Sequence, residues 1–166
     1  VHRAIAGQHQ LIIDVGRRRG PLRGDTGLCL ESICWSTFNN ITIRNASDAG
    51  VLLQGNKEAD KVSHNTFSNF VIEGVEDGNG SSAFGVHVTQ TEEFSYNTFS
   101  SFVIKGIGSD TDGKRAFIHI GPVDNGNHVG NLFSGFTCDG SQMAGISLRH
   151  LTDSKFHDIY MKNIGL

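Results

Sequence analysis

The chain of 166 residues carries a net charge of −3 and contains 21 glycines but only two prolines. This length fits one domain, and the small negative charge excludes a strong attraction to nucleic acid or to an acidic membrane surface. Abundant glycine with a modest apolar fraction favours many short strands over a helical bundle. The three cysteines have no zinc-like spacing and indicate no disulfide framework. No metal site and no cofactor are predicted.

Residues 1–26 are predicted to form an N-terminal arm or cap, and residues 27–166 a parallel β-helix. Within the arm, the segment from Leu11 to Val15 is interpreted as either a poorly matched first strand or part of the cap. The basic run Arg17–Arg19 is interpreted as solvated rather than anion-binding. The sequence shows no signal peptide and no transmembrane run.

From residue 27 onward, two families of strand-like segments alternate along the chain. The first family is rich in glycine, and its members are Gly27–Glu31, Gly50–Gln54, Gly85–Thr89, Phe117–Gly121 and Gly145–Arg149. The second family shares an S/N-x-F beginning, and its members are Ser36–Arg44, Asn65–Glu73, Asn97–Lys105, Asn131–Asp139 and Ser154–Lys162. Both families alternate apolar and other residues at period two, which predicts strands with one buried face.

The spacing of the second family indicates the architecture. Its first phenylalanines are Phe38, Phe67, Phe99, Phe133 and Phe156, so the steps are 29, 32, 34 and 23 residues. A pattern that stays intact while its period drifts is typical of a solenoid with loops of variable length. We therefore predict an all-β, single-stranded, right-handed parallel β-helix of about five coils. Each coil is expected to hold two strands and a short third strand around the Phe.

Stacking the second family in sequence order places apolar residues in inward columns and charges in one outward column. The charged column alternates in sign, and its members are Arg44, Glu73, Lys105, Asp139 and Lys162. Parallel strands lie about 4.8 Å apart, so each charge is expected beside an opposite one. This column is interpreted as a structural feature that fixes the register of the coils.

Asparagine recurs at one turn position, as Asn65, Asn97 and Asn131. Side-chain amides stacked in this way can hydrogen-bond from coil to coil, so we predict a structural Asn ladder. Cys138 falls on an inward column, which predicts a buried thiol.

The glycine-rich strands lie between two sets of enlarged loops, at 55–64, 90–96 and 122–130 on one side and at 74–83 and 106–115 on the other. Function on a repeat scaffold gathers where insertions cluster, so we expect a groove over the outward positions of these strands. His87 and His119 are expected one coil apart on its floor, and both are expected to titrate near neutrality.

The candidate catalytic residues are His87, His119, Asp110 and Asp112. Paired carboxylates can act as acid and base on a glycosidic bond, and a histidine can remove a sugar proton in a lyase; both chemistries stay open. The candidate substrate-binding residues on the floor and walls are Glu31, Gln54, Glu76, Asp77, Arg115 and Arg149. The oxygen-rich turns at Asp77 and Asp110 complete no calcium-binding loop, so no metal is predicted there.

With its NTFSxFxIxG-type coils, Gly-Val-x-Val strands and turn asparagines, the chain from Gly27 to Leu166 resembles the pectate-lyase-like superfamily of right-handed parallel β-helices. This superfamily includes pectate lyases, polygalacturonases, alginate-modifying enzymes and phage tailspike depolymerases, most of which act on polysaccharides. The resemblance implies a polysaccharide partner and an extracellular or virion-associated location. No recognised catalytic motif is matched, so the resemblance assigns no catalytic residue.

Two classes of function stay open. The first is a carbohydrate-binding or polysaccharide-processing β-helix that uses the groove on the Gly-Val-x-Val face, as a lyase or glycoside hydrolase if it is an enzyme. The second is a non-catalytic structural segment of an oligomeric spike, adhesin or other assembly. Such a segment would make a homo-oligomer through the outward Val71/Val103 face or through the open ends of the solenoid. Trp35 and Tyr96 are the candidate exposed aromatics for sugar contact.

Overall fold

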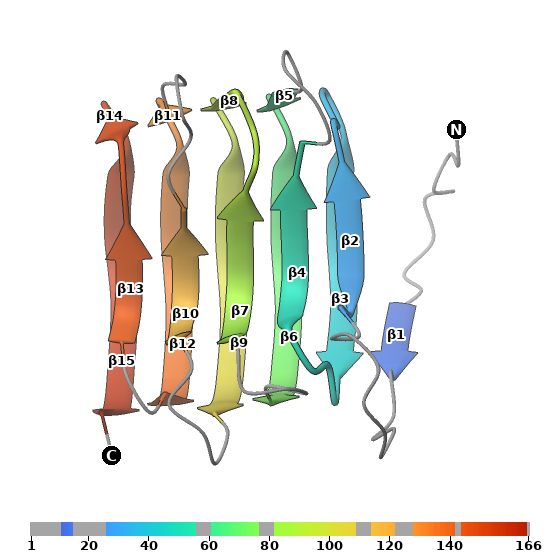
Figure 1. Cartoon of the computed structure of the whole chain (residues 1–166), viewed down its shortest axis with the longest axis vertical. Coiled ribbons are helices and arrows are strands. Elements are labelled where there is room, and N and C mark those ends of the chain that lie inside the picture. The colour runs from blue at the N-terminus through green and yellow to red at the C-terminus, as the bar shows by residue number, and fades with distance from the viewer. Residues whose placement is uncertain are drawn as a thin grey trace.

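In a computed structural model, which describes residues 11–14, 26–55, 61–76, 82–108, 114–121, 128–141 and 144–165, the chain is an all-β parallel solenoid (Figure 1). This confirms the predicted parallel β-helix architecture. No helix in the described part of the chain is long and apolar enough to cross a membrane.

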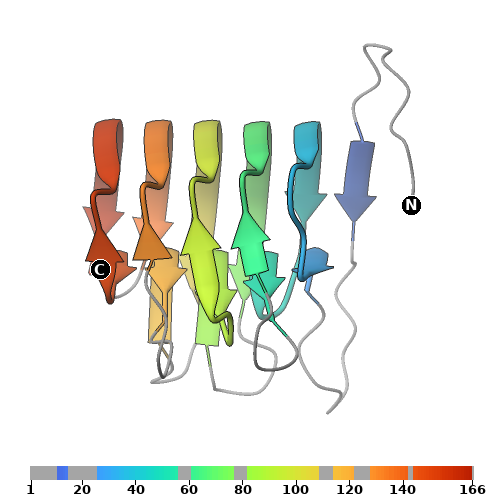
Figure 2. The same ribbon diagram turned by 90° about the horizontal axis from the view of Figure 1, so that it is seen from above.

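Two long parallel sheets run the length of the solenoid. The first, here called the long sheet, contains in spatial order β1 (Leu11–Asp14), β3 (Thr37–Arg44), β6 (Thr66–Glu76), β9 (Thr98–Gly108), β12 (Leu132–Ser141) and β15 (Lys155–Ile164). The second, here called the glycine-rich sheet, contains β2 (Leu28–Glu31), β4 (Ala49–Gln54), β7 (Ser82–Thr89), β10 (Lys114–Ile120) and β13 (Ala144–Leu148). Seen from above, successive turns lie side by side (Figure 2). The first strand pairs with β3 in parallel, so the segment at Leu11 is a strand.

Four short strands form a third face. They pair as β5 (Lys61–Ser63) with β8 (Glu93–Ser95), and β11 (His128–Val129) with β14 (Leu151–Thr152). Most of this face lies inside segments expected to be loops, and the expected third strand around the Phe is instead continuous with the long strands. The expectation fails because each short strand contributes only one inward apolar or aromatic residue, such as Val62 or Phe94, which is too short a pattern to recognise.

The predicted register is confirmed. Pairing in the long sheet aligns Arg44 with Glu73, Glu73 with Lys105, Lys105 with Asp139, and Asp139 with Lys162. Glu73 accepts from Arg44 Nε at 3.2 Å and lies 3.9 Å from Lys105 Nζ. Lys162 Nζ lies 2.9 Å from Asp139. The alternating column is therefore a row of exposed ion pairs along the solenoid.

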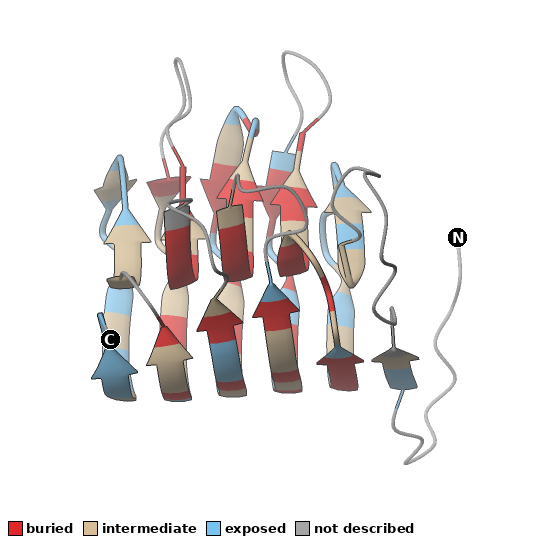
Figure 3. Ribbon diagram, turned by 60° about the horizontal axis from the view of Figure 1, so that its bottom comes forward, coloured by how far each residue is buried: buried red, intermediate tan, exposed pale blue. Residues whose placement is uncertain are grey.

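About three turns of the solenoid have a neighbouring turn on both sides, and these turns enclose the complete core. Their strands are β4 with β6, β7 with β9, and β10 with β12. Phe67, Phe99 and Phe133 are fully buried there, whereas Phe38 and Phe156 in the outer strands are half-buried. Figure 3 shows the same loss of burial toward the ends. The expectation of about five coils is thus corrected to about three enclosed turns, because the outer strands have little or no cover on one side.

Stacked aromatics and amides hold the enclosed turns together. The rings of Phe67 and Phe133 stack on either side of Phe99, with centroids 4.7 and 4.8 Å away. The predicted Asn ladder is confirmed: Asn97 Oδ1 accepts from the backbone N–H and side-chain amide of Asn65 at 3.1 and 3.0 Å. Asn97 Nδ2 donates in turn to Asn131 Oδ1 at 3.0 Å and to the Val62 carbonyl at 2.8 Å. Each amide thereby ties one coil to the next.

The inward thiol is confirmed as well. Cys138 is fully buried, and this burial raises its pKa to about 12. Such a thiol stays protonated and unreactive, so its role is packing.

Near the middle of β3, β6, β9 and β12, one residue has a left-handed backbone, in addition to a second such position toward the end of β6, β9 and β12. The φ angles at the middle position are 57° at Asn40, 57° at Asn69, 58° at Ser101 and 65° at Gly135. Because asparagine and glycine accept positive φ more readily than most residues, this recurring choice of residue permits a bend there. The bend hollows the outer side of the long sheet.

Candidate functional site

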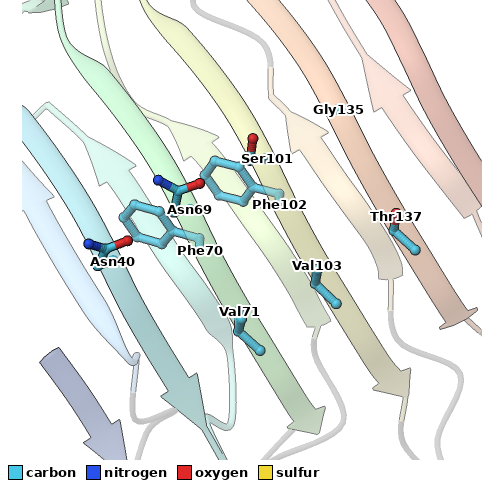
Figure 4. A pocket seen from close by; sticks show the side chains of 9 residues that line it. All are labelled: Asn40, Asn69, Phe70, Val71, Ser101, Phe102, Val103, Gly135 and Thr137. Atoms are coloured by element: carbon cyan, nitrogen blue, oxygen red, sulfur yellow. The ribbon is translucent and has the colours of Figure 1, made fainter. Parts of the chain in front are cut away.

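A groove lies on the hollowed side of the long sheet. It holds about 600 Å³ and crosses β3, β6, β9 and β12, and its lining is Asn40, Asn69, Phe70, Val71, Ser101, Phe102, Val103, Gly135 and Thr137. Figure 4 shows Asn40, Asn69 and Ser101 in one row, with Val71, Val103 and Thr137 in a parallel row. Four strands about 4.8 Å apart make the groove roughly 14 Å long. We call it the Val71/Val103 groove.

The register explains the two rows. Val71 pairs with Val103 and Val103 with Thr137, so one residue per coil points outward beyond the bend. Phe70 and Phe102 stack beneath the floor with centroids 4.8 Å apart and are buried. The stacked rings fix the backbone under the groove, so its shape is set by the packed core.

The polar row has capacity for a ligand. Asn69 Nδ2 donates to Asn39 Oδ1 at 2.8 Å, which leaves its carbonyl oxygen at the groove. Among the described residues, the side chains of Asn40 and Ser101 have no hydrogen-bond partner. Amide and hydroxyl groups of this kind can both donate and accept, which suits hydroxyl-rich ligands.

The outward surface of the glycine-rich sheet differs from the groove. The expected column is confirmed, because Leu52 pairs with His87, His87 with His119, and His119 with Ser147. Phe84 lies over both histidines, with ring centroids 4.3 Å from His87 and 4.7 Å from His119. The two imidazoles are 5.2 Å apart. We call this packed cluster of Phe84, His87 and His119 the His face.

His87 is desolvated in this cluster. Burial, and secondly the charge of His119, lowers the pKa of His87 to about 3. The expectation that His87 titrates near neutrality is therefore wrong, because strand parity placed the side chain outward but Phe84 (only 2% exposed) packs against it. Nδ1 of His87 is buried and has no hydrogen-bond partner among the described residues.

The other predicted site residues within the described ranges are scattered over both long sheets. Glu31 and Gln54 lie together, and Gln54 Nε2 donates to Glu31 Oε1 at 2.6 Å. Glu76 ends β6 at an exposed position, and Arg149 lies exposed just after β13. Arg115 is buried in β10, with 6% of its surface exposed.

Asp77, Asp110 and Asp112 lie outside the described residues, so their predicted roles stay predictions. Among the described residues, no group of three His, Cys, Asp or Glu side chains suits a metal ion.

Two features escaped sequence reasoning. His128 is fully buried beside Phe94, and burial lowers its pKa. Trp35, His64 and Tyr96 share one turn position with positive φ. The Trp35 ring stacks on His64 with centroids 4.1 Å apart, and the Tyr96 ring lies tilted against His64 at 5.1 Å. Trp35 and Tyr96 are 77% and 56% exposed, as expected for candidate sugar contacts. The signal was the recurrence of aromatic residues directly before Ser36, Asn65 and Asn97.

Comparison with protein-family models gives no match, and neither do comparisons with curated proteins and with solved structures.

Proposed function

We propose that this chain binds an elongated polysaccharide. The observation that carries the proposal is the Val71/Val103 groove, which crosses four neighbouring strands and sets a row of amide and hydroxyl groups beside a row of methyl-bearing side chains. A pyranose presents hydroxyls at its edge and C–H groups on its face. These two rows match those two chemistries, and their repeat along the solenoid suits a repeating ligand.

The proposal includes the right-handed coil and the relationship to the pectate-lyase-like superfamily. Crossovers between parallel strands of one sheet are right-handed in about 98% of cases, which supports this hand. The confirmed parallel solenoid and the Asn ladder are consistent with the resemblance. The relationship itself is a proposal about fold ancestry, and the polysaccharide partner rests on the groove.

The test is glycan binding by the intact chain with one variant that fills the groove. Val103→Tyr is suited to this, because Tyr160 occupies the same outward column and is 60% exposed there. We expect binding of at least one polysaccharide on an immobilised panel, and a loss of roughly tenfold or more in affinity in Val103→Tyr.

Thr66→Tyr is the matched control. Thr66 lies at the start of β6, is exposed, and does not line the groove. It should bind as the wild type does. Equal loss in both variants, or the absence of any bound polysaccharide, would contradict the proposal.

A finer proposal is that the protein is an enzyme that cleaves the bound polysaccharide. The candidate catalytic residues are His87 and His119, together with Asp110 and Asp112. A histidine whose pKa is about 3 is a weak base, so the geometry supports binding more strongly than catalysis. New unsaturated or reducing ends, lost in both His87→Ala and His119→Ala, would establish an enzyme. Unchanged release in both variants would remove the His face from the mechanism.

One observation favours the structural alternative. Phe156, Ile159 and Met161 of the last long strand are only half-buried, although their counterparts in the enclosed turns are fully buried. An exposed end of this kind can stack on another chain. Sedimentation over a range of concentrations tests this, and a monomer at all concentrations would argue against assembly through the ends.

A further inference from the structure

The charge pattern of the Val71/Val103 groove bears on which glycans it accepts. None of the nine lining residues is ionisable. The polar members are Asn40, Asn69, Ser101 and Thr137, which are neutral at every physiological pH. A ligand in the groove therefore meets hydrogen-bonding groups and apolar surface without a formal charge.

The cations of the neighbouring charged column are already paired. The charged column lies two residues beyond the Val71 row on the same strands, and there Glu73 contacts both Arg44 at 3.2 Å and Lys105 at 3.9 Å. Lys162 contacts Asp139 at 2.9 Å, and Asn163 also donates to Asp139 at 2.7 Å. Because the signs alternate along the column, their fields largely cancel at the groove.

The row of left-handed residues Asn40, Asn69, Ser101 and Gly135 continues past the groove to a negatively charged residue on β15. Asp158 has a φ of 54° and follows Gly135 in this row. Its carboxylate lies 2.8 Å from His157 Nδ1, and its side chain is 81% exposed. An acidic polymer extending from the groove along the row would meet this carboxylate.

We propose that the Val71/Val103 groove selects neutral polysaccharides over uronic-acid polymers. This inference rests on the proposed function. A uronate would lose part of its hydration in the groove and find no unpaired cation among the described lining residues to compensate. A neutral sugar gives up only hydroxyl hydration, which the amides and hydroxyls replace.

The experiment uses matched pairs of glycans on a binding panel. Each pair consists of an acidic polysaccharide, such as polygalacturonate or alginate, and the same polymer with its carboxyl groups reduced to alcohols. Neutral glucans, mannans and galactans complete the panel. We expect binding to neutral members only, an affinity that does not change with added salt, and loss of roughly tenfold or more in Val103→Tyr but not in Thr66→Tyr.

Val71→Lys supplies a gain-of-function arm. A lysine in the floor adds one unpaired cation, so this variant should acquire salt-sensitive binding to acidic members. If the wild type binds an acidic polymer through the groove more tightly than its reduced form, the inference is overturned and the proposed function stands. If no panel member binds, both are overturned.

Discussion

The His face and the Val71/Val103 groove are both outward surfaces of parallel sheets, yet they differ in solvent contact. On the His face, Phe84 packs against His87 and His119, and His87 is desolvated. In the groove, the backbone bend at residues such as Asn69 opens the surface instead. The difference shows that an outward strand position can still be covered by a neighbouring side chain, as His87 is, or lie open in a groove, as Val103 does.

The largest test of this difference is the pH dependence of stability. The pKa of His87 is about 3 in the folded protein and near 6.5 when unfolded, so below pH 6.5 the unfolded state takes up a proton that the folded state does not. The contribution of neutral His87 to the stability of the folded protein is fully present above pH 6.5 and is lost progressively as the pH falls toward 3. We expect His87 to account for about 2–3 kcal/mol of the loss between pH 7 and pH 4.

Urea unfolding across this range, compared with His87→Leu, provides the measurement. Leucine fits the column, because Leu52 pairs with His87. The variant should lose less stability on acidification than the wild type. Both proteins should still lose some stability as the pH falls, because burial also lowers the pKa of His128. Identical slopes would show that the His face is open to water.

A second test applies one substitution to a buried and to a groove asparagine. Asn97→Ser removes the amide that donates to Asn131 and to the Val62 carbonyl, so we expect a loss of about 2–3 kcal/mol. Asn69→Ser places at the bend the residue found at Ser101 and should change stability by about 0.5 kcal/mol or less. Similar losses in chemical denaturation would mean that the groove row is structural.

A third, smaller effect concerns the charged column beside the groove. Glu73→Gln removes the shared partner of Arg44 and Lys105, and exposed pairs of this kind contribute about 0.2–1 kcal/mol. The loss should shrink at high salt, because screening weakens the pairs in the wild type. The freed cations should also raise affinity for acidic glycans, and no such rise would show that the column does not influence the groove.

The sequence predicts the columns because their signal repeats in every coil. Arg44, Glu73 and Lys105 follow from period-two alternation and register, and so does the ladder through Asn97. Alternation defines to which face of the sheet a side chain points but not which residues cover it. The burial of His87 against Phe84 therefore could not be predicted from the sequence.

The groove left a weaker signal in the sequence. Asn40, Asn69, Ser101 and Gly135 interrupt the alternation at one repeated position, and three of these four are asparagine or glycine. Such a column points to a backbone with positive φ. Whether the bend opens or closes the outer surface depends on tertiary packing, above all on the stacked Phe70 and Phe102 beneath it.

The smallest expected effect is the stability of Val103→Tyr. Val103 is outward in β9, and its column already contains the exposed Tyr160, so the larger ring should extend into the groove without displacing the core. We expect a change of about 0.5 kcal/mol or less in thermal or urea unfolding. On the His face, Leu52→Tyr adds similar bulk beside His87 and should cost about 1–3 kcal/mol through overpacking. If Val103→Tyr were the more damaging of the two, the groove would be the closed surface and the His face the open one.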